Sequence, residues 1–85
     1  MTTAEITAAV VTGLRQVAPD ADLASLASDA PLRETLGIDS FDFLTFIVGL
    51  HKTVGVQVPE ADYGQLSTLD RLVSYLAARV APPAG

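Results

Sequence analysis

The sequence contains no cysteine, no tryptophan and a single histidine. Without cysteine there is neither a disulfide framework nor a thiolate metal site, and one histidine cannot build an imidazole cluster. No apolar run approaches the roughly 20 residues that a membrane-spanning helix requires. The fold must therefore rest on apolar packing, and we expect neither a metal site nor membrane insertion.

Basic residues are also scarce. Five lysine and arginine residues stand against ten aspartate and glutamate residues, giving a formal net charge of −5. This balance opposes binding to nucleic-acid backbones and anionic lipid surfaces and favours a basic protein partner. The N-terminal segment MTTAEITAAVVTGL lacks the cationic start and continuous apolar core of a signal peptide. We therefore expect a cytoplasmic protein with no nucleic-acid or membrane partner.

The remaining composition is typical of one folded domain, with 49% hydrophobic and 18% charged residues in 85. Thr2 and Glu5 have the spacing of a capping box, and the apolar stripe after them predicts a first helix that ends before Pro19. Residues 18–38 mix turn signals with spaced leucines, which predicts a long loop containing a short helical turn.

Three more helices are expected further along the chain. The second begins at Asp39 or Ser40 and ends near Val54, a short third helix occupies residues 59–65, and the last follows the capping spacing of Ser67 and Asp70. The predicted fold is all-α, with three main helices, one short helix and a long loop after the first. Residues 1–81 are expected to form the domain and residues 82–85 a disordered tail. Met1 and the short APPAG end favour a free-standing protein, and the alternative is an excised domain, because proline and alanine also suit a linker.

The second helix carries two apolar stripes when it is drawn on a helical wheel. The wider stripe has the width that packs against a helix's own domain; it comprises Phe43, Phe46, Ile47, Leu50 and Val54. The narrower stripe comprises Phe41, Leu44 and Val48. Two interpretations of the narrower stripe remain open: either the long loop covers it, or it is an exposed surface that partner proteins bind.

Ser40, at the start of this helix, also has more than one interpretation. Serine is a preferred N-cap residue, so the first is an ordinary helix cap. The second is an exposed hydroxyl that a partner enzyme modifies, because a phosphodiester there would lie in the favourable field of the free amides. A nucleophile activated by His51 is disfavoured, since the two residues lie roughly 16 Å apart along the helix.

The stretch LGIDSFDFL resembles the attachment motif of acyl carrier proteins, usually Leu-Gly-x-Asp-Ser-Leu-Asp. Further along, VGVQVP and STLDRLVSYL resemble the segment before that family's third helix and its last helix, so the resemblance covers nearly the whole chain. It implies a small right-handed four-helix bundle without catalysis of its own. A phosphopantetheinyl transferase would attach phosphopantetheine from coenzyme A to Ser40, and the thiol of that arm would carry acyl groups as thioesters.

The resemblance also implies roles for residues around Ser40. The expected partners are the transferase and the enzymes that load and transfer acyl groups, each meeting a monomeric carrier. Residues expected to recognise these partners are Asp39, Phe41, Asp42, Leu44 and Val48. Residues expected to line a core cavity that opens for the acyl chain are Phe43, Phe46, Ile47, Leu50, Leu72 and Leu76.

Two departures from the family pattern affect the expected pathway. Phe41 replaces the usual leucine, and the second helix nearly lacks the usual acidic face, since Asp39 and Asp42 are the only acids between Asp39 and Val54. Three phenylalanines in this helix would also fill part of the cavity. These features favour a specialised polyketide, nonribosomal peptide or modified-lipid pathway over housekeeping fatty acid synthesis. The alternatives are an unmodified helical interaction module with a carrier-like fold and, less favoured, a small hydrolase that uses Ser40.

Overall fold

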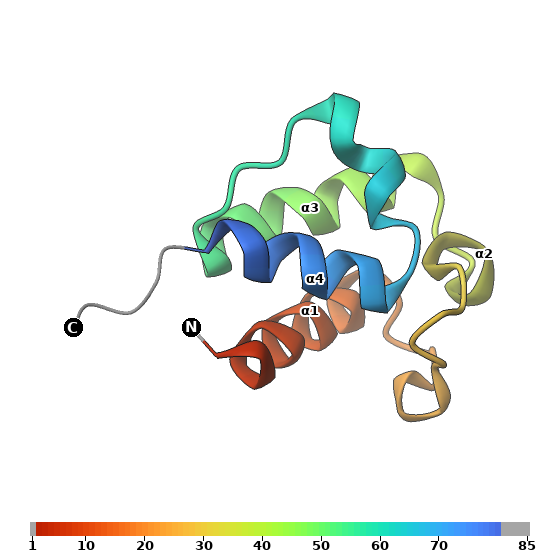
Figure 1. The fold of residues 1–85 in the computed structure, drawn as a ribbon. Coiled ribbons are helices and arrows are strands. Elements are labelled where there is room, and N and C mark those ends of the chain that lie inside the picture. Colours follow the sequence, from red (N-terminus) through yellow and green to blue (C-terminus); the bar gives the residue numbers. More distant parts are fainter. Residues whose placement is uncertain (1, 81–85) are drawn as a thin grey trace.

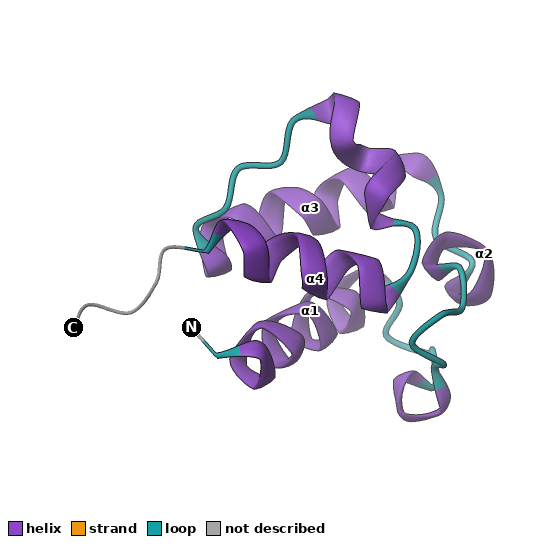
Figure 2. Cartoon of the chain, viewed as in Figure 1, coloured by secondary structure: helices purple, strands orange, loops and turns teal. Residues whose placement is uncertain are grey.

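A computed structural model describes residues 2–80, which form helices and connecting loops with no regular strand in that range (Figure 1, Figure 2). Two of the helices, η1 and η2, are of the 3₁₀ type. In chain order the elements are α1 (Thr3–Val17), η1 (Leu23–Ser25), α2 (Leu32–Leu36), α3 (Ser40–Val54), η2 (Glu60–Leu66) and α4 (Leu69–Arg79). The expected all-α fold with three long helices is confirmed. The expected tail, residues 82–85, lies outside the described residues.

Helix α1 begins with the predicted capping box. Thr2 Oγ1 accepts a hydrogen bond from the Glu5 backbone N–H at 3.1 Å, and Glu5 Oε1 accepts one from the Thr2 N–H at 2.9 Å. The latter bond, to the Thr2 backbone, is the main cause that lowers the pKa of Glu5. The helix ends at Val17, before Pro19, as predicted. Both ends therefore follow from local signals in the sequence.

The connection between α1 and α3 contains more secondary structure than the expected loop with one helical turn. It includes two short helices, η1 and α2. Leu32 is fully buried, and its backbone N–H donates to the Ser67 carbonyl at 2.8 Å. A second backbone bond joins the Asp70 N–H to the Ser28 carbonyl at 2.9 Å. The middle of the connection is thus fastened to the start of α4.

The predicted cap of α4 is wrong by one residue. Thr68, not Ser67, has the extended backbone of an N-cap, and its Oγ1 accepts from the Arg71 N–H at 3.2 Å. Ser67 keeps a right-handed helical conformation at the end of η2, with φ −72° and ψ −24°. Thr68 is also paired with Pro31 in an isolated antiparallel bridge, which agrees with its extended backbone.

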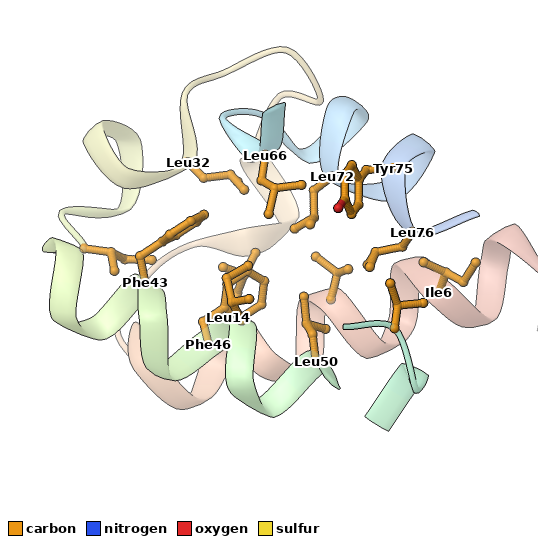
Figure 3. Close-up of a cluster of buried hydrophobic side chains, with 14 residues drawn as sticks. Ile6, Leu14, Leu32, Phe43, Phe46, Leu50, Leu66, Leu72, Tyr75 and Leu76 are labelled. Atoms are coloured by element: carbon orange, nitrogen blue, oxygen red, sulfur yellow. The ribbon is translucent and has the colours of Figure 1, made fainter. Parts of the chain in front are cut away.

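The core lies where α1, α3 and α4 meet. α1 packs against both α3 and α4, and η2 packs against α4 (Figure 1). Side chains from these helices converge in one apolar cluster (Figure 3). Its members are Ile6, Val10, Leu14, Leu32, Ile38, Phe43, Phe46, Ile47, Leu50, Val56, Leu66, Leu72, Tyr75 and Leu76. Within the part of the chain that the structure describes, no helix combines the length and apolar character needed to cross a bilayer.

Candidate functional site

At the start of α3, the helix cap and an exposed hydroxyl belong to two adjacent residues. Asp39 is the N-cap, with an extended backbone, and its Oδ1 accepts from the Asp42 N–H at 2.8 Å. Ser40 is the first helical residue and is exposed. Its hydroxyl makes no hydrogen bond to any side chain or backbone group in residues 2–80. The interpretation of Ser40 as an ordinary cap is therefore wrong, because Asp39 does the capping.

The turn before Asp39 sets the direction in which α3 leaves the connection. Gly37 ends α2 in the left-handed conformation, with φ 68°, which a residue with a Cβ adopts only with strain. Ile38 then enters the core with 5% of its surface exposed. A glycine and a buried anchor thus fix the backbone immediately before the cap and Ser40.

A hollow of about 540 Å³ lies beside Ser40, between α2, the start of α3 and η2. Its buried members are Ile38 and Phe43, and Tyr63 is half-buried. The remaining lining residues are exposed and mostly polar: Pro31, Arg33, Glu34, Ser40, Gly64 and Ser67. The hollow therefore has an apolar inner end and polar walls.

The narrower apolar stripe of α3 is uncovered. Phe41 is 74% exposed, Leu44 43% and Val48 47%, and these are the large exposed hydrophobic side chains of the described chain. The interpretation in which the long connection covers them is wrong. Asp39 is exposed and Asp42 half-buried at the N-terminal end of the same helix. We call the set Phe41, Leu44 and Val48 the apolar strip.

The wider stripe of α3 faces the core. Phe43, Phe46, Ile47 and Leu50 are each at most 6% exposed, and they belong to the same apolar cluster as Leu72 and Leu76 of α4. The rings of Phe43 and Phe46 lie 5.9 Å apart at a tilt of 53°. These six residues are the ones expected to line an acyl cavity, and here they form a packed core. Their role toward an acyl chain stays a prediction.

A polar contact between η2 and α4 was not anticipated from the sequence. Tyr75 donates its hydroxyl to Asp62 Oδ2 at 2.7 Å, and the guanidinium carbon of Arg79 lies 3.5 Å from the Tyr75 ring centroid. The hydrogen bond to Asp62, aided by burial, raises the pKa of Tyr75 above its ordinary value of 10.0, and the positive charge of Arg79 opposes this shift. The contact fastens η2 to the last helix.

The raised pKa of Tyr75 predicts a loss of stability at high pH. A raised pKa in the folded state stabilises the fold fully below the unfolded pKa of about 10, and this contribution is lost as pH rises through the folded value. We expect the urea midpoint of the native chain to fall more steeply above pH ~10 than that of Tyr75→Phe. Parallel pH profiles for the two chains would contradict this expectation.

His51 and Ser40 are not brought together. His51 lies exposed in the last turn of α3, and Ser40 lies in the first turn of the same 15-residue helix. A straight helix of this length holds its two ends roughly 20 Å apart. The arrangement thus gives Ser40 no hydrogen-bonded base, which a serine nucleophile would need.

Comparison with known proteins agrees with the helical fold. The family model described as the phosphopantetheine attachment site matches residues 7–76. The acyl carrier protein of Streptomyces coelicolor is 29% identical over 66 residues, which cover 78% of this chain and 72% of that protein. The acyl carrier protein of Thermotoga maritima is 30% identical over 59 residues, which cover 69% of this chain and 73% of that protein. The acyl carrier protein of Campylobacter hominis is 30% identical over 67 residues, which cover 79% of this chain and 80% of that protein.

The family match spans most of the chain and includes all of α3, whose first turn presents the exposed serine. The three relatives are all named acyl carrier proteins, and they align with this chain over 59 to 67 residues. The protein is accordingly a carrier and not a catalyst, and its prosthetic group is a covalently attached phosphopantetheine that holds acyl groups. The chain belongs to the phosphopantetheine-binding acyl carrier protein family.

Proposed function

We propose that Ser40 is the residue that carries the phosphopantetheine arm. The observation that supports this most directly is the capping of α3 by Asp39, which leaves the adjacent Ser40 hydroxyl exposed and without an internal partner. In the loading reaction, the Ser40 oxygen forms a new bond to the phosphorus that bears pantetheine in coenzyme A. The pyrophosphate bond breaks, the adenosine bisphosphate leaves with the electron pair, and the hydroxyl proton passes to a base of the transferase.

The backbone around Ser40 suits the phosphodiester that this reaction leaves behind. The first intrahelical bond of α3 runs from the Phe43 N–H to the Asp39 carbonyl at 3.0 Å. The amides of Ser40 and Phe41 precede it, so they remain available to a negatively charged oxygen. The positive end of the helix dipole adds to this effect. Asp39 and Asp42 contribute negative charge nearby, which suits a basic transferase better than a free anion.

Intact mass measurement tests the proposal. The purified chain is incubated with coenzyme A and a broad-specificity phosphopantetheinyl transferase, and we expect it to gain the mass of one phosphopantetheine. Fragmentation of the modified peptide should place the group on Ser40. No gain by a folded chain would instead favour the unmodified interaction module, and modification of another serine would contradict the assignment.

We further propose that partner enzymes bind the apolar strip together with Asp39 and Asp42. The strip exposes three large apolar side chains on one face of α3, at the spacing by which helical surfaces are recognised. Helix α3 offers little acidic charge beyond its first turn, where Asp42 is the acidic residue. Partner choice should accordingly depend on shape and apolar contact more than on electrostatic steering.

A charge placed in the apolar strip should slow loading without unfolding the chain. We expect Leu44→Asp to reduce the kcat/KM of the transferase roughly thirtyfold, the effect of losing about 2 kcal/mol at an interface hot spot. Ser74→Asp, which adds the same charge to an exposed position of α4, should load at the native rate. Equal loading of both variants would show that the strip is not used.

We propose that the carrier serves a specialised pathway of polyketide, nonribosomal peptide or modified-lipid type. The support is the exposed Phe41 and the near absence of acidic side chains along α3. The triple variant Phe41→Leu, Thr45→Glu and His51→Glu changes only exposed positions. It should raise turnover of the loaded carrier by a fatty acid ketosynthase. Unchanged turnover would remove the support for a specialised pathway.

A further inference from the structure

The 3₁₀ helix η2 is held from two sides by adjacent residues. Tyr63 meets Phe43 of α3 edge to face, with ring centroids 6.4 Å apart and an interplanar angle of 81°. Its neighbour Asp62 accepts the 2.7 Å hydrogen bond from Tyr75 of α4. Movement of η2 away from the bundle would therefore break an aromatic contact and a partly buried hydrogen bond together.

The two rings join the hollow beside Ser40 to the core, because Phe43 belongs to the core cluster and Tyr63 packs against it. Phe43 and Tyr63 both line the hollow. Phe43 is only 6% exposed and contacts Phe46 on its inner side, where the packed cluster begins (Figure 3). An acyl group that is tethered at Ser40 and enters the hollow would meet this ring pair before it could reach Leu72 or Leu76.

We propose that Phe43 and Tyr63 form an aromatic gate that keeps an acyl group in the hollow and out of the core. The inference rests on the proposed attachment at Ser40 and deepens it by naming the cargo, which is a short acyl group. A long alkyl chain gains from leaving water only if it is buried. With the gate closed, its extra methylene groups meet walls that include Arg33, Glu34 and Ser67, all exposed.

The gate predicts that the wild-type carrier leaves the thioester equally exposed to solvent whether the attached chain is short or long. Butyryl-phosphopantetheine and decanoyl-phosphopantetheine are installed from the corresponding acyl coenzyme A and confirmed by mass. Cleavage of each thioester by neutral hydroxylamine is then timed. We expect equal rates for the two chains on wild-type protein, because neither enters the core.

Opening the gate should make the rate of thioester cleavage depend on the length of the acyl chain. In Tyr63→Ala, we expect decanoyl cleavage to slow about tenfold relative to butyryl, as it does if the sheltered form makes up about nine tenths of the population. Phe43→Leu tests the other half of the gate and should act in the same direction. Tyr63→Phe keeps the ring that closes the hollow, so it should behave as wild type.

The outcomes separate the gate from the attachment. Failure of wild-type protein to load would overturn attachment at Ser40 and the gate with it. Loaded wild-type protein that already protects decanoyl would overturn the gate alone. The gate would also be wrong if folded Phe43→Leu and Tyr63→Ala both cleaved the two chains at equal rates. Should Tyr63→Ala fail to fold, Phe43→Leu and the wild-type comparison decide.

Discussion

Ser40→Ala is expected to lose the entire mass gain with coenzyme A and to keep its helical structure. If Ser40 is the attachment residue, as we propose, the loss is complete, because its hydroxyl oxygen would form the new bond to phosphorus and alanine offers no substitute. The helix survives because its cap is Asp39, whose side chain bonds the Asp42 N–H. Alanine is also a strong helix former in general. Circular dichroism and intact mass, measured on one preparation, test both parts.

Ser67→Ala is the matched control. Ser67 is exposed and lines the same hollow as Ser40, but it precedes α4 and does not lie on the first turn of α3. The variant should gain one phosphopantetheine at the native rate. If Ser67→Ala failed to gain the mass of phosphopantetheine while Ser40→Ala gained it, the attachment site would be Ser67 and our proposal would be wrong.

The second large effect is expected in the core. Phe46→Ala should lower the free energy of unfolding by about 3–5 kcal/mol, the usual cost of removing a buried phenylalanine and leaving a cavity. Phe46 is 2% exposed, contacts Phe43 and lies against α1. The free energy of unfolding of a small domain is only about 5–15 kcal/mol in total, so this variant should lose a large part of its stability. Urea unfolding followed by circular dichroism measures the loss.

Gly13 of α1 supplies a control for the geometry of this contact. A Cβ at Gly13 would lie 3.0 Å from both Cδ1 and Cε1 of Phe46, closer than an ordinary contact. Gly13→Ala should therefore destabilise wild-type protein but stabilise Phe46→Ala, where the new methyl group occupies vacated space. Gly49→Ala has no heavy atom within 4 Å of its Cβ and should stabilise both backgrounds by about 1 kcal/mol. Equal effects of Gly13→Ala in both backgrounds would contradict the contact.

The parts of the fold that were predictable from sequence depend on neighbours in the chain. The capping box at Thr2 and the end of α3 at Val54, followed by a left-handed Gly55, are local signals and are confirmed. The cap of α4 has two neighbouring candidates, Ser67 and Thr68, and the extended Thr68 is paired with Pro31, which is far away in sequence. No local pattern reports such a pairing, so the sequence alone does not distinguish Thr68 from Ser67.

At the candidate site, too, local patterns were predictable from the sequence and contacts between distant segments were not. A helical wheel separates the two stripes of α3, but it cannot say whether the connection before α3 covers Phe41; that depends on where α2 packs. The bond between Asp62 and Tyr75 joins two helices, and neither residue stands in a motif that predicts it. Sequence reasoning thus singled out Ser40 and the residues of the apolar strip, whose roles stay predictions, and it missed the contacts that hold η2.

The division of tasks between Asp39 and Ser40 has a consequence for loss of function. Because the cap and the hydroxyl belong to different residues, we expect a substitution at Ser40 to leave the fold and the exposed apolar strip intact. If partner enzymes bind the strip, as we propose, such a chain would still occupy their binding sites while delivering nothing to them. We expect it to act as a competitive inhibitor of the intact carrier, so that a cell expressing both forms would show a dominant-negative phenotype instead of a recessive one.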